Sequence, residues 1–279
     1  MRPKCKLLAV DIDGTLLDPA GRLSPRVRAA VDKACAAGVT VVVATGRRYR
    51  TSRAIAEDAG LSSYVICQHG THIRRMSDDS LVWSAPFEKD AARAVVEVMI
   101  EHGFEPRVFL DGFDREMDFL IITGLPQPKE MFGYTGTAWR VAKEIEVPDG
   151  MAIMVVASFG GVDALEPALD EIRALGGGRV TAHVINPPGA PYWCLEAMSP
   201  RAGKGSALLV LAERLDVKPE ETAAVGDDIN DVDMIEKAGV GIAMGNAVEA
   251  VKEAADFIVA ANGDDGLAEA IERLLSGAT

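Results

Sequence analysis

The chain has 279 residues, 48% of them hydrophobic and 25% charged, which is typical of a globular protein with one large or two modest domains. Its 29 Lys and Arg against 42 Asp and Glu give a formal net charge of −13, which argues against a nucleic-acid partner, because a phosphate backbone requires a basic face. Four scattered cysteines and no long apolar run argue against structural disulfides, a zinc site, a signal peptide and a membrane span, so we expect a cytoplasmic protein with no membrane partner.

The first third of the chain alternates predicted strands and helices. Ser24 and Pro25 indicate a helix start, because Ser caps free amide groups and Pro fits the first turn, and Gly38 indicates its end. The residues of 39–44 are apolar on both faces, as a strand inside a parallel sheet requires. In order, we predict strand 6–10, a helix running to about 37, strand 39–44, helix 48–59 and strand 64–67. This is a βαβαβ unit.

The middle of the chain has a different pattern, with pairs of strands beside single helices. Segment 124–149 is rich in Gly and Pro and is left unassigned. The predicted elements are helix 88–102, strands 106–110, 117–122 and 151–157, helix 162–175, and strands 180–185 and 192–197. Strand pairs of this kind predict an inserted α+β domain with an antiparallel sheet, which we place at 84–196.

The last third returns to alternating helices and strands. The predicted elements are helix 203–215, strand 222–225, helix 229–238, strand 240–243, helix 248–254, strand 256–260 and helix 265–275. Residues 1–83 and 197–279 therefore form one discontinuous α/β domain in this prediction, built on a parallel sheet and interrupted by the insert.

Polar residues follow the predicted strands of this α/β domain. Ligands of open parallel sheets bind at the carboxyl ends of the strands, so these residues are candidates for a site. They are Asp11 and Asp13; Thr45, Gly46 and Arg47; His69 and Gly70; Gly226, Asp227, Asp228, Asn230 and Asp231; and Lys204, which begins the helix after the insert.

Each of these residues also has a purely structural interpretation. A single Asp after a strand is commonly a turn residue or a helix cap, and we keep the helix-cap interpretation for Asp228. Arg47 and Lys204 could be solvated side chains. Their convergence favours a site, because acids gathered at one sheet edge repel one another unless a cation neutralises them. An all-oxygen ligand set that also meets phosphate fits Mg²⁺ best.

A phosphate group would explain the remaining donors. Thr45 offers a hydroxyl and Lys204 a positive charge. Asp11 can then be a nucleophile that forms an aspartyl-phosphate, provided that the cation and Lys204 offset the repulsion between the two anions. Asp13 points to the same side of the extended strand end, so it can serve as the general acid and then the general base.

Four motifs of the chain resemble, in order, those of the haloacid dehalogenase superfamily of phosphatases. They are DIDGTL at 11–16, ATGR at 44–47, GKG at 203–205 and GDDINDVDM at 226–234. GIAMGNA at 241–247 and ADFIVAANGDDG at 255–266 resemble its Cof-type branch, which carries a class IIB cap between the second and third motifs. The resemblance implies a Rossmann-like parallel-sheet core with helices on both faces and makes the insert the α+β cap domain.

The resemblance also implies roles for the site residues. It makes Asp11 the nucleophile and a metal ligand, and Asp13 the acid/base, with its backbone carbonyl on Mg²⁺. It places Thr45 and Lys204 on the phosphoryl group and Asp227 on the metal.

Six further positions are implied to lie at the site, one of them with an unusual residue. The resemblance places Asp231 on the metal directly or through water, Asn230 where it shapes the site, and Gly46 and Arg47 beside the phosphate. His69-Gly70 stands where the branch usually has Asn-Gly. His69 either donates to a substrate oxygen or fills space in the pocket.

The leading hypothesis is a Mg²⁺-dependent phosphomonoester hydrolase whose substrates are small phosphorylated metabolites, either sugar phosphates or phosphoglycolate-like acids. A phosphomutase, which would return the phosphoryl group to a sugar, remains a rival. A catalytically silent ligand-binding or regulatory protein is the rival from another class, although such a protein has no need of the nucleophile Asp11.

Overall fold

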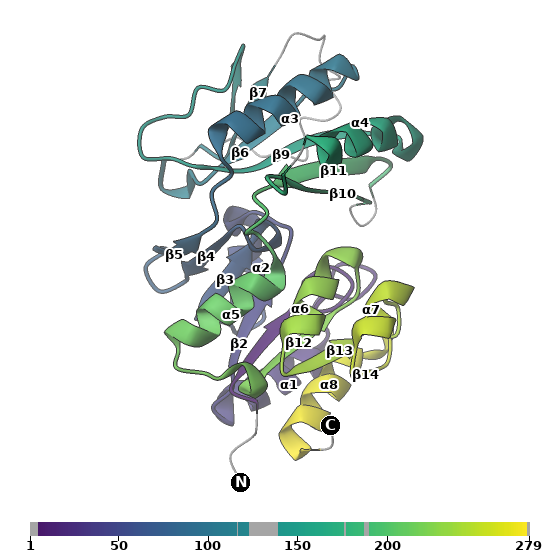
Figure 1. The fold of residues 1–279 in the computed structure, drawn as a ribbon. Coiled ribbons are helices and arrows are strands. Elements are labelled where there is room, and N and C mark those ends of the chain that lie inside the picture. The colour runs from purple at the N-terminus through teal and green to yellow at the C-terminus, as the bar shows by residue number, and fades with distance from the viewer. Residues whose placement is uncertain (1–4, 116, 123–138, 176, 187–189, 278–279) are drawn as a thin grey trace. The chain divides into compact units, whose positions relative to one another are not determined.

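The computed structural model describes residues 5–115, 117–122, 139–175, 177–186 and 190–277. The chain divides into two compact units: the core unit, Met1–Ser84 with Ala202–Thr279, and the inserted unit, Ala85–Arg201 (Figure 1). The sequence prediction placed the ends of the insert at 84 and 196. Among the described helices, none combines the length and the apolar character that crossing a membrane requires.

The core unit is built on a mixed sheet of eight strands in the order β14-β13-β12-β1-β2-β3-β4-β5. All neighbouring pairs from β14 to β3 are parallel, whereas β3–β4 and β4–β5 are antiparallel. The strands are β1 Leu7–Val10, β2 Thr40–Ala44, β3 Tyr64–Cys67, β4 His72–Arg75, β5 Leu81–Ser84, β12 Thr222–Gly226, β13 Val240–Ala243 and β14 Phe257–Ile258. The predicted α/β class is confirmed.

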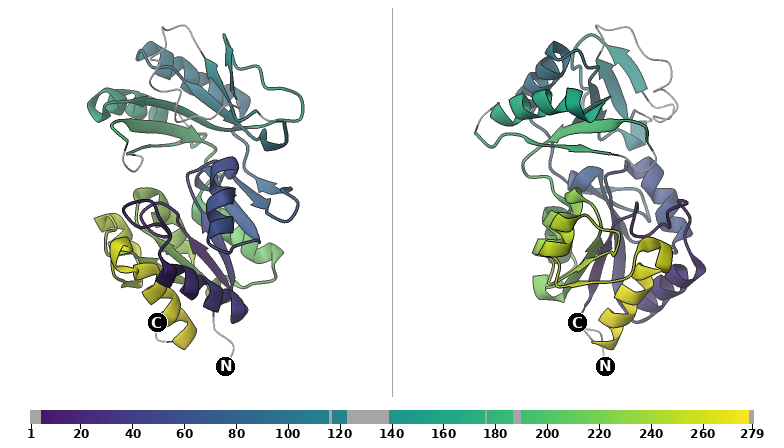
Figure 2. Two further views of the ribbon diagram at one scale, coloured as in Figure 1. Left: turned by 180° about the vertical axis from the view of Figure 1, so that it is seen from behind. Right: turned by 90° about the vertical axis from the view of Figure 1, so that its right-hand side faces the viewer.

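Helices cover both faces of this sheet, which lets the central strands be apolar throughout. Helix α5 packs on α6 on the face toward the viewer in Figure 1, and α1 packs on α8 on the opposite face, seen from behind in Figure 2. The helices are α1 Pro25–Ala36, α2 Tyr49–Asp58, α5 Lys204–Arg214, α6 Val232–Lys237, α7 Glu249–Ala254 and α8 Gly266–Ser276. All four residues of β1 are buried as a consequence.

The hairpin of β4 and β5 was not predicted, and one buried residue explains why. Arg74 is only 1% exposed, although a run such as HIRR has no apolar pattern. Its guanidinium donates to the carbonyl oxygen of Asp79 at 2.6 Å and lies over the ring of Tyr49, 5.6 Å from the centroid. Asp79 belongs to the turn of the hairpin itself, whereas Tyr49 belongs to α2, so the apolar pattern of the run alone could not reveal the strand.

The inserted unit is an α+β layer with the strand order β10-β11-β9-β6-β7-β8, antiparallel except between β7 and β8. Its two helices pack on one face of the sheet through an apolar cluster. The elements are α3 Lys89–Glu101, α4 Val162–Ala174, β6 Arg107–Leu110, β7 Phe119–Ile122, β8 Trp139–Ala142, β9 Ile153–Gly160, β10 Thr181–Ile185 and β11 Trp193–Met198. Strand β8 lies in the segment that the sequence left unassigned.

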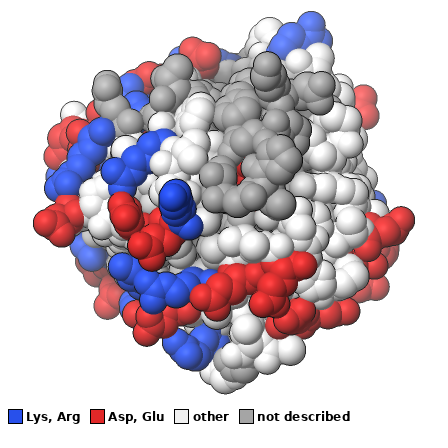
Figure 3. Space-filling view, turned by 90° about the horizontal axis from the view of Figure 1, so that it is seen from above, with Lys and Arg blue, Asp and Glu red and all other residues white. Residues whose placement is uncertain are grey.

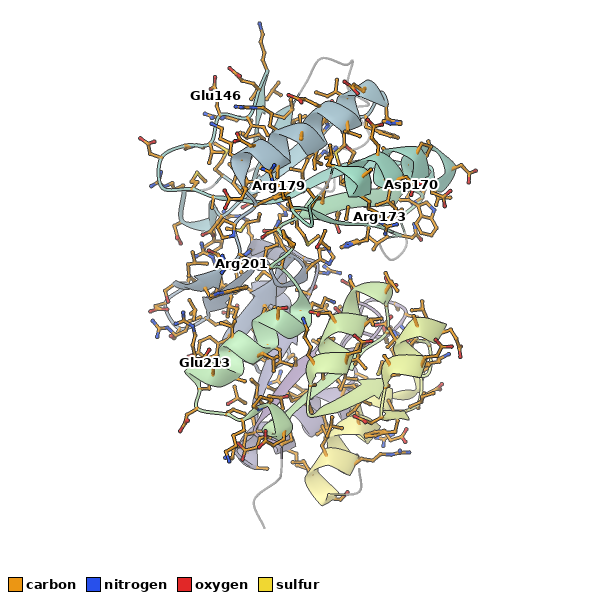
Figure 4. The ribbon with its side chains drawn as sticks, viewed as in Figure 1. Glu146, Asp170, Arg173, Arg179, Arg201 and Glu213 are labelled. Atoms are coloured by element: carbon orange, nitrogen blue, oxygen red, sulfur yellow. The ribbon has the colours of Figure 1, made fainter. Side chains whose placement is uncertain are left out.

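Charged side chains lie on parts of the surface of the inserted unit. Arg173 of α4 reaches the edge strand β10, where its guanidinium donates to the carbonyl oxygen of Ala182 at 3.2 and 3.3 Å (Figure 4). On the face drawn in Figure 3, Lys and Arg side chains lie among Asp and Glu side chains. Positive and negative charges are therefore interspersed on that face.

The N-terminus of α1 offers a test of the local folding argument. The Ser24 hydroxyl accepts a hydrogen bond from the Val27 amide at 3.1 Å and donates one to Asp265, so Ser24→Ala removes both contacts and should lower the free energy of unfolding by at least about 1 kcal/mol. Ser276→Ala is the matched control, because that exposed hydroxyl only donates to Arg273. Chemical denaturation of both variants measures the difference, and an equal effect in the two would contradict the capping role.

Candidate active site

The register of three parallel strands brings the candidate residues together. Val10 of β1 pairs with Val43 of β2 on one side and with Val225 of β12 on the other. The chain leaves all three strands at the same sheet edge, and the Asp11 amide still donates to the Val225 carbonyl at 3.0 Å. The first, second and fourth motifs therefore meet at the carboxyl ends of these strands.

Lys204 is the centre of the site and is only 1% exposed. Its ammonium donates to Oδ1 of Asp11 at 2.6 Å, to Oδ1 of Asp231 at 2.6 Å and to Oδ1 of Asn230 at 3.0 Å. An ammonium has three protons, so these three acceptors saturate it. One buried cation at the start of α5 thus joins Asp11, just after β1, to Asn230 and Asp231, just before α6.

Asp231 is fully buried, and both of its carboxylate oxygens are hydrogen-bonded. Oδ1 accepts from Lys204, while Oδ2 accepts from the backbone amides of Asp227 at 2.9 Å and Asp228 at 3.0 Å. A Cβ on Gly226 would lie 2.5 Å from that of Asp231, so this close approach requires glycine. Asp231 therefore fixes the loop that carries Asp227.

Three carboxylates of the site form a cluster that fits a hard divalent cation. Oxygens of Asp11, Asp227 and Asp231 lie within 4.8 Å of one another. With all three ionised, one ammonium leaves two negative charges uncompensated, and oxygen donors of this kind suit hard cations. The donor set and the charge excess both match such an ion.

The pKa values show the same charge imbalance. Burial, and then the neighbouring Asp231 and Asp227, raise the pKa of Asp11 well above its usual value, although Lys204 opposes this. Burial also raises the pKa of Asp227 to about 7, against the hydrogen bond from Thr15. Burial lowers the pKa of Lys204, but Asp11 and Asp231 together outweigh it and raise that pKa, so the lysine stays charged.

Asp13 lies outside this cluster and is paired with Arg47. The guanidinium donates through Nε to Oδ2 at 2.6 Å and through Nη2 to Oδ1 at 2.5 Å, which is a bidentate contact. The Arg47 amide also donates to the Thr45 hydroxyl at 3.1 Å, and Thr45 is 1% exposed. The predicted phosphate residues thus lie beside the predicted acid/base.

The sequence did not predict two site residues that contact Asp227. The Thr15 hydroxyl donates to its Oδ1 at 2.7 Å, and the Asn246 amide donates to its Oδ2 at 3.4 Å and to the Gly14 carbonyl at 2.9 Å. A Cβ on Gly14, whose φ is 87°, would lie 2.0 Å from Asp227 Oδ2. Thr15 and Asn246 both stand inside motifs quoted above, so their polar side chains were the available signal.

The turn after β3 brings the remaining predicted residues to the site. His69 is buried, and its Nδ1 lies 3.2 Å from Nδ2 of Asn230. A Cβ on Gly70, whose φ is 82°, would lie 2.1 Å from the carbonyl oxygen of Gly203. Asp228 accepts from the Ile229 amide at 2.7 Å, which confirms the helix-cap interpretation of that residue.

Comparison with known proteins places this geometry in context. Residues 8–271 match the family model described as haloacid dehalogenase-like hydrolase. A 5-amino-6-(5-phospho-D-ribitylamino)uracil phosphatase of Bacillus subtilis is 30% identical, and the match covers 95% of this chain and 94% of the relative.

Solved structures share the whole fold. A haloacid dehalogenase-like hydrolase from B. subtilis has a TM-score of 0.81 at 26% identity, covering 97% of this chain and 100% of that one. A sugar phosphatase of HAD subclass IIB has a TM-score of 0.75 at 22% identity, covering 96% and 98%. At this low identity, the comparison with the sugar phosphatase shows that the two proteins share a fold and nothing further.

The raised pKa of Asp227 predicts how stability depends on pH. Because its folded pKa of about 7 exceeds the ordinary 3.8, the folded metal-free protein holds more protons than the unfolded chain between these values. The Tm of the metal-free protein should therefore fall as the pH rises from about 5 to about 7.5. Added MgCl₂ should raise the Tm by more at the higher pH than at the lower one.

Differential scanning calorimetry of Asp227→Asn tests this, with Asp170→Asn in α4 as the control. Asp170 is exposed (Figure 4), so its variant should keep the full pH-dependent fall in Tm. Asp227→Asn should lose part of that fall. An equal gain from MgCl₂ at both pH values would refute the linkage.

The hydrogen bond from Thr15 predicts a second effect. Thr15→Val keeps the side-chain shape but removes the donor that holds Asp227, so affinity for Mg²⁺ should fall about tenfold. Thr15→Ser should keep most of it. Isothermal titration calorimetry with MgCl₂ measures both, and wild-type affinity in Thr15→Val would show that this contact does not orient the ligand.

Proposed function

The chain belongs to the haloacid dehalogenase-like hydrolases, and from this membership we propose that it is a Mg²⁺-dependent phosphomonoester hydrolase that works through an aspartyl-phosphate. One observation carries the proposal. The buried carboxylate of Asp11 lies 2.6 Å from a buried, charged Lys204 at the edge of an acidic cluster. Burial and the neighbouring acids raise the pKa of Asp11, whereas Lys204 lowers it, so the ammonium favours the anionic nucleophile and would also offset the charge of a phosphate.

Mg²⁺ fits the acidic cluster, in which Asp11 and Asp227 would hold it. Asp231 suits a contact through water, because both of its oxygens already accept hydrogen bonds from the protein. When bound, the ion supplies positive charge for the oxygens of the transferring phosphoryl group.

The proposed reaction has two displacements. A carboxylate oxygen of Asp11 forms a bond to phosphorus, the bond from phosphorus to the ester oxygen breaks, and Asp13 donates a proton to the departing alkoxide. Asp13 then takes a proton from water, which attacks phosphorus and releases inorganic phosphate and free Asp11. Asp13 must leave Arg47 to act, and Lys204 must exchange one of its three acceptors for a phosphoryl oxygen, which Thr45 also holds.

The proposed substrates are small phosphorylated metabolites, namely sugar phosphates or phosphoglycolate-like acids. The name of the B. subtilis relative supports the first kind, because its substrate carries phosphate on a ribityl chain. A phosphate-release screen over about a hundred phosphorylated metabolites, ranked by kcat/KM, identifies the preferred ester.

Replacing the nucleophile tests the mechanism. Asp11→Asn should lower kcat by about 10³-fold or more, because an amide cannot form the acyl-phosphate, while Asp170→Asn should act as wild type. The wild type should also lose turnover when EDTA removes divalent ions. Substantial turnover in Asp11→Asn would refute the covalent route.

Product analysis tests the reaction class. With a hexose 1-phosphate and Mg²⁺, the wild type should release inorganic phosphate. An accumulating isomer without free phosphate would instead establish a phosphomutase. No Mg²⁺-dependent turnover across the whole panel would overturn the enzymatic proposal and favour a binding protein.

A further inference from the structure

The turn that carries His69 has a costly backbone conformation. Gln68 and His69 have φ values of 45° and 57°, in the left-handed region that side chains other than glycine rarely adopt, and Gly70 follows at 82°. Residues in this conformation are strained and persist only where surrounding structure fixes them. The Gln68 amide donates to the Arg47 carbonyl and the His69 amide to the Thr45 carbonyl, both at 3.0 Å. The turn is thereby fixed to the loop after β2.

The imidazole of His69 lies between this loop and the loop of the fourth motif. The side chain is 4% exposed. A Cβ on Gly46 would lie 2.5 Å from its Cε1 and 2.8 Å from its Nε2, so the ring packs directly on the Gly46 backbone. On its other edge, Nδ1 lies 3.2 Å from Nδ2 of Asn230. The ring therefore has little room to turn.

The contacts of Asn230 indicate which ring nitrogen accepts a hydrogen bond. Lys204 can only donate hydrogen bonds, so the amide group of Asn230 must direct its oxygen to the ammonium, at 3.0 Å. Its NH₂ group then faces His69 and must donate, which requires a lone pair on Nδ1. The proton of the neutral imidazole consequently lies on Nε2, at the edge of the ring next to Gly46.

We propose that His69 is a positioning residue, whose Nδ1 lone pair holds the Asn230 amide and through it directs the ammonium of Lys204 toward Asp11. Two of the three acceptors of Lys204 are carboxylates, and Asn230 is the neutral third. Without an acceptor at position 69 the amide can rotate, and a rotated amide presents N–H groups to the ammonium. The orientation of Lys204 would then vary, although its charge would remain.

Two substitutions separate positioning from space filling. In His69→Asn the side-chain oxygen is bonded to Cγ, as Nδ1 is in histidine, so it can accept from Asn230. His69→Leu has a similar volume and no acceptor. We expect His69→Leu to lower kcat by about 10- to 100-fold with little change in KM, and His69→Asn to stay within about threefold of wild type.

The control for these kinetics is His102→Gln, which changes a histidine of the inserted unit that pairs with Glu171. It should keep wild-type kcat and KM. If His69→Leu retains wild-type kcat, or if His69→Asn falls as far while melting within about 4 °C of wild type, the positioning role is refuted.

A second measurement needs no turnover, so it stands even if the proposed hydrolase activity fails. The chain has four histidines, and ¹⁵N NMR of the labelled protein resolves their tautomers, with the signals of His69 assigned by their loss in His69→Asn. The wild type should show His69 neutral with its proton on Nε2. Asn230→Asp puts an acceptor at the contact, so Nδ1 should become protonated. A proton on Nδ1 in the wild type, or no change in Asn230→Asp, would overturn the proposal.

Discussion

One buried ammonium that faces three buried or partly buried carboxylates is the constraint on which the rest of the site depends. Lys204 accounts for Asp11 and Asp231 directly, whereas Asp227 has no hydrogen bond from it in the described contacts, and burial followed by the nearby Asp231 raises the pKa of Asp227 to about 7. Burying an ion is tolerable only when its partners are near and hydrogen-bonded. The excess negative charge of the cluster can therefore be offset by protons, and the proposed divalent cation would offset it at a pH where the carboxylates are ionised.

This constraint explains several features of the backbone around it. The parallel register of β1 and β12 brings Asp11 to the loop that holds Asp227. Gly14 and Gly226 have no side chains because the carboxyl groups of Asp227 and Asp231 occupy that space. These two glycines are thus required by the packing of acids against backbone, in addition to the positive φ of Gly14.

The sequence predicted the parts of the fold that local pattern determines. Alternating buried strands and capped helices were evident in both outer thirds, and polar residues after the strands marked the site edge. The sequence did not reveal the hairpin β4–β5, because the strand contains the charged Arg74, which is buried against the Asp79 carbonyl in its own turn and against Tyr49, 25 residues earlier in the chain. For the same reason, the pairing of Asp13 with Arg47 could not be foreseen, since both could face a phosphate. The link from His69 to Asn230 depends on strained backbone that leaves no sequence signal.

The two carboxylates that we propose as catalytic form ion pairs that differ in burial. Asp11 pairs with Lys204 and Asp13 with Arg47, and this difference suits their roles. The Asp11–Lys204 pair is almost fully buried, with side chains 8% and 1% exposed, so separating it would leave an unpaired charge in the interior. The Asp13–Arg47 pair is 24% and 37% exposed, and pairs open to solvent contribute only about 0–1 kcal/mol. A nucleophile must stay ionised and in line with phosphorus, whereas an acid/base must exchange protons and partners twice in each cycle. Burial fixes the first carboxylate, and solvent access leaves the second free to move.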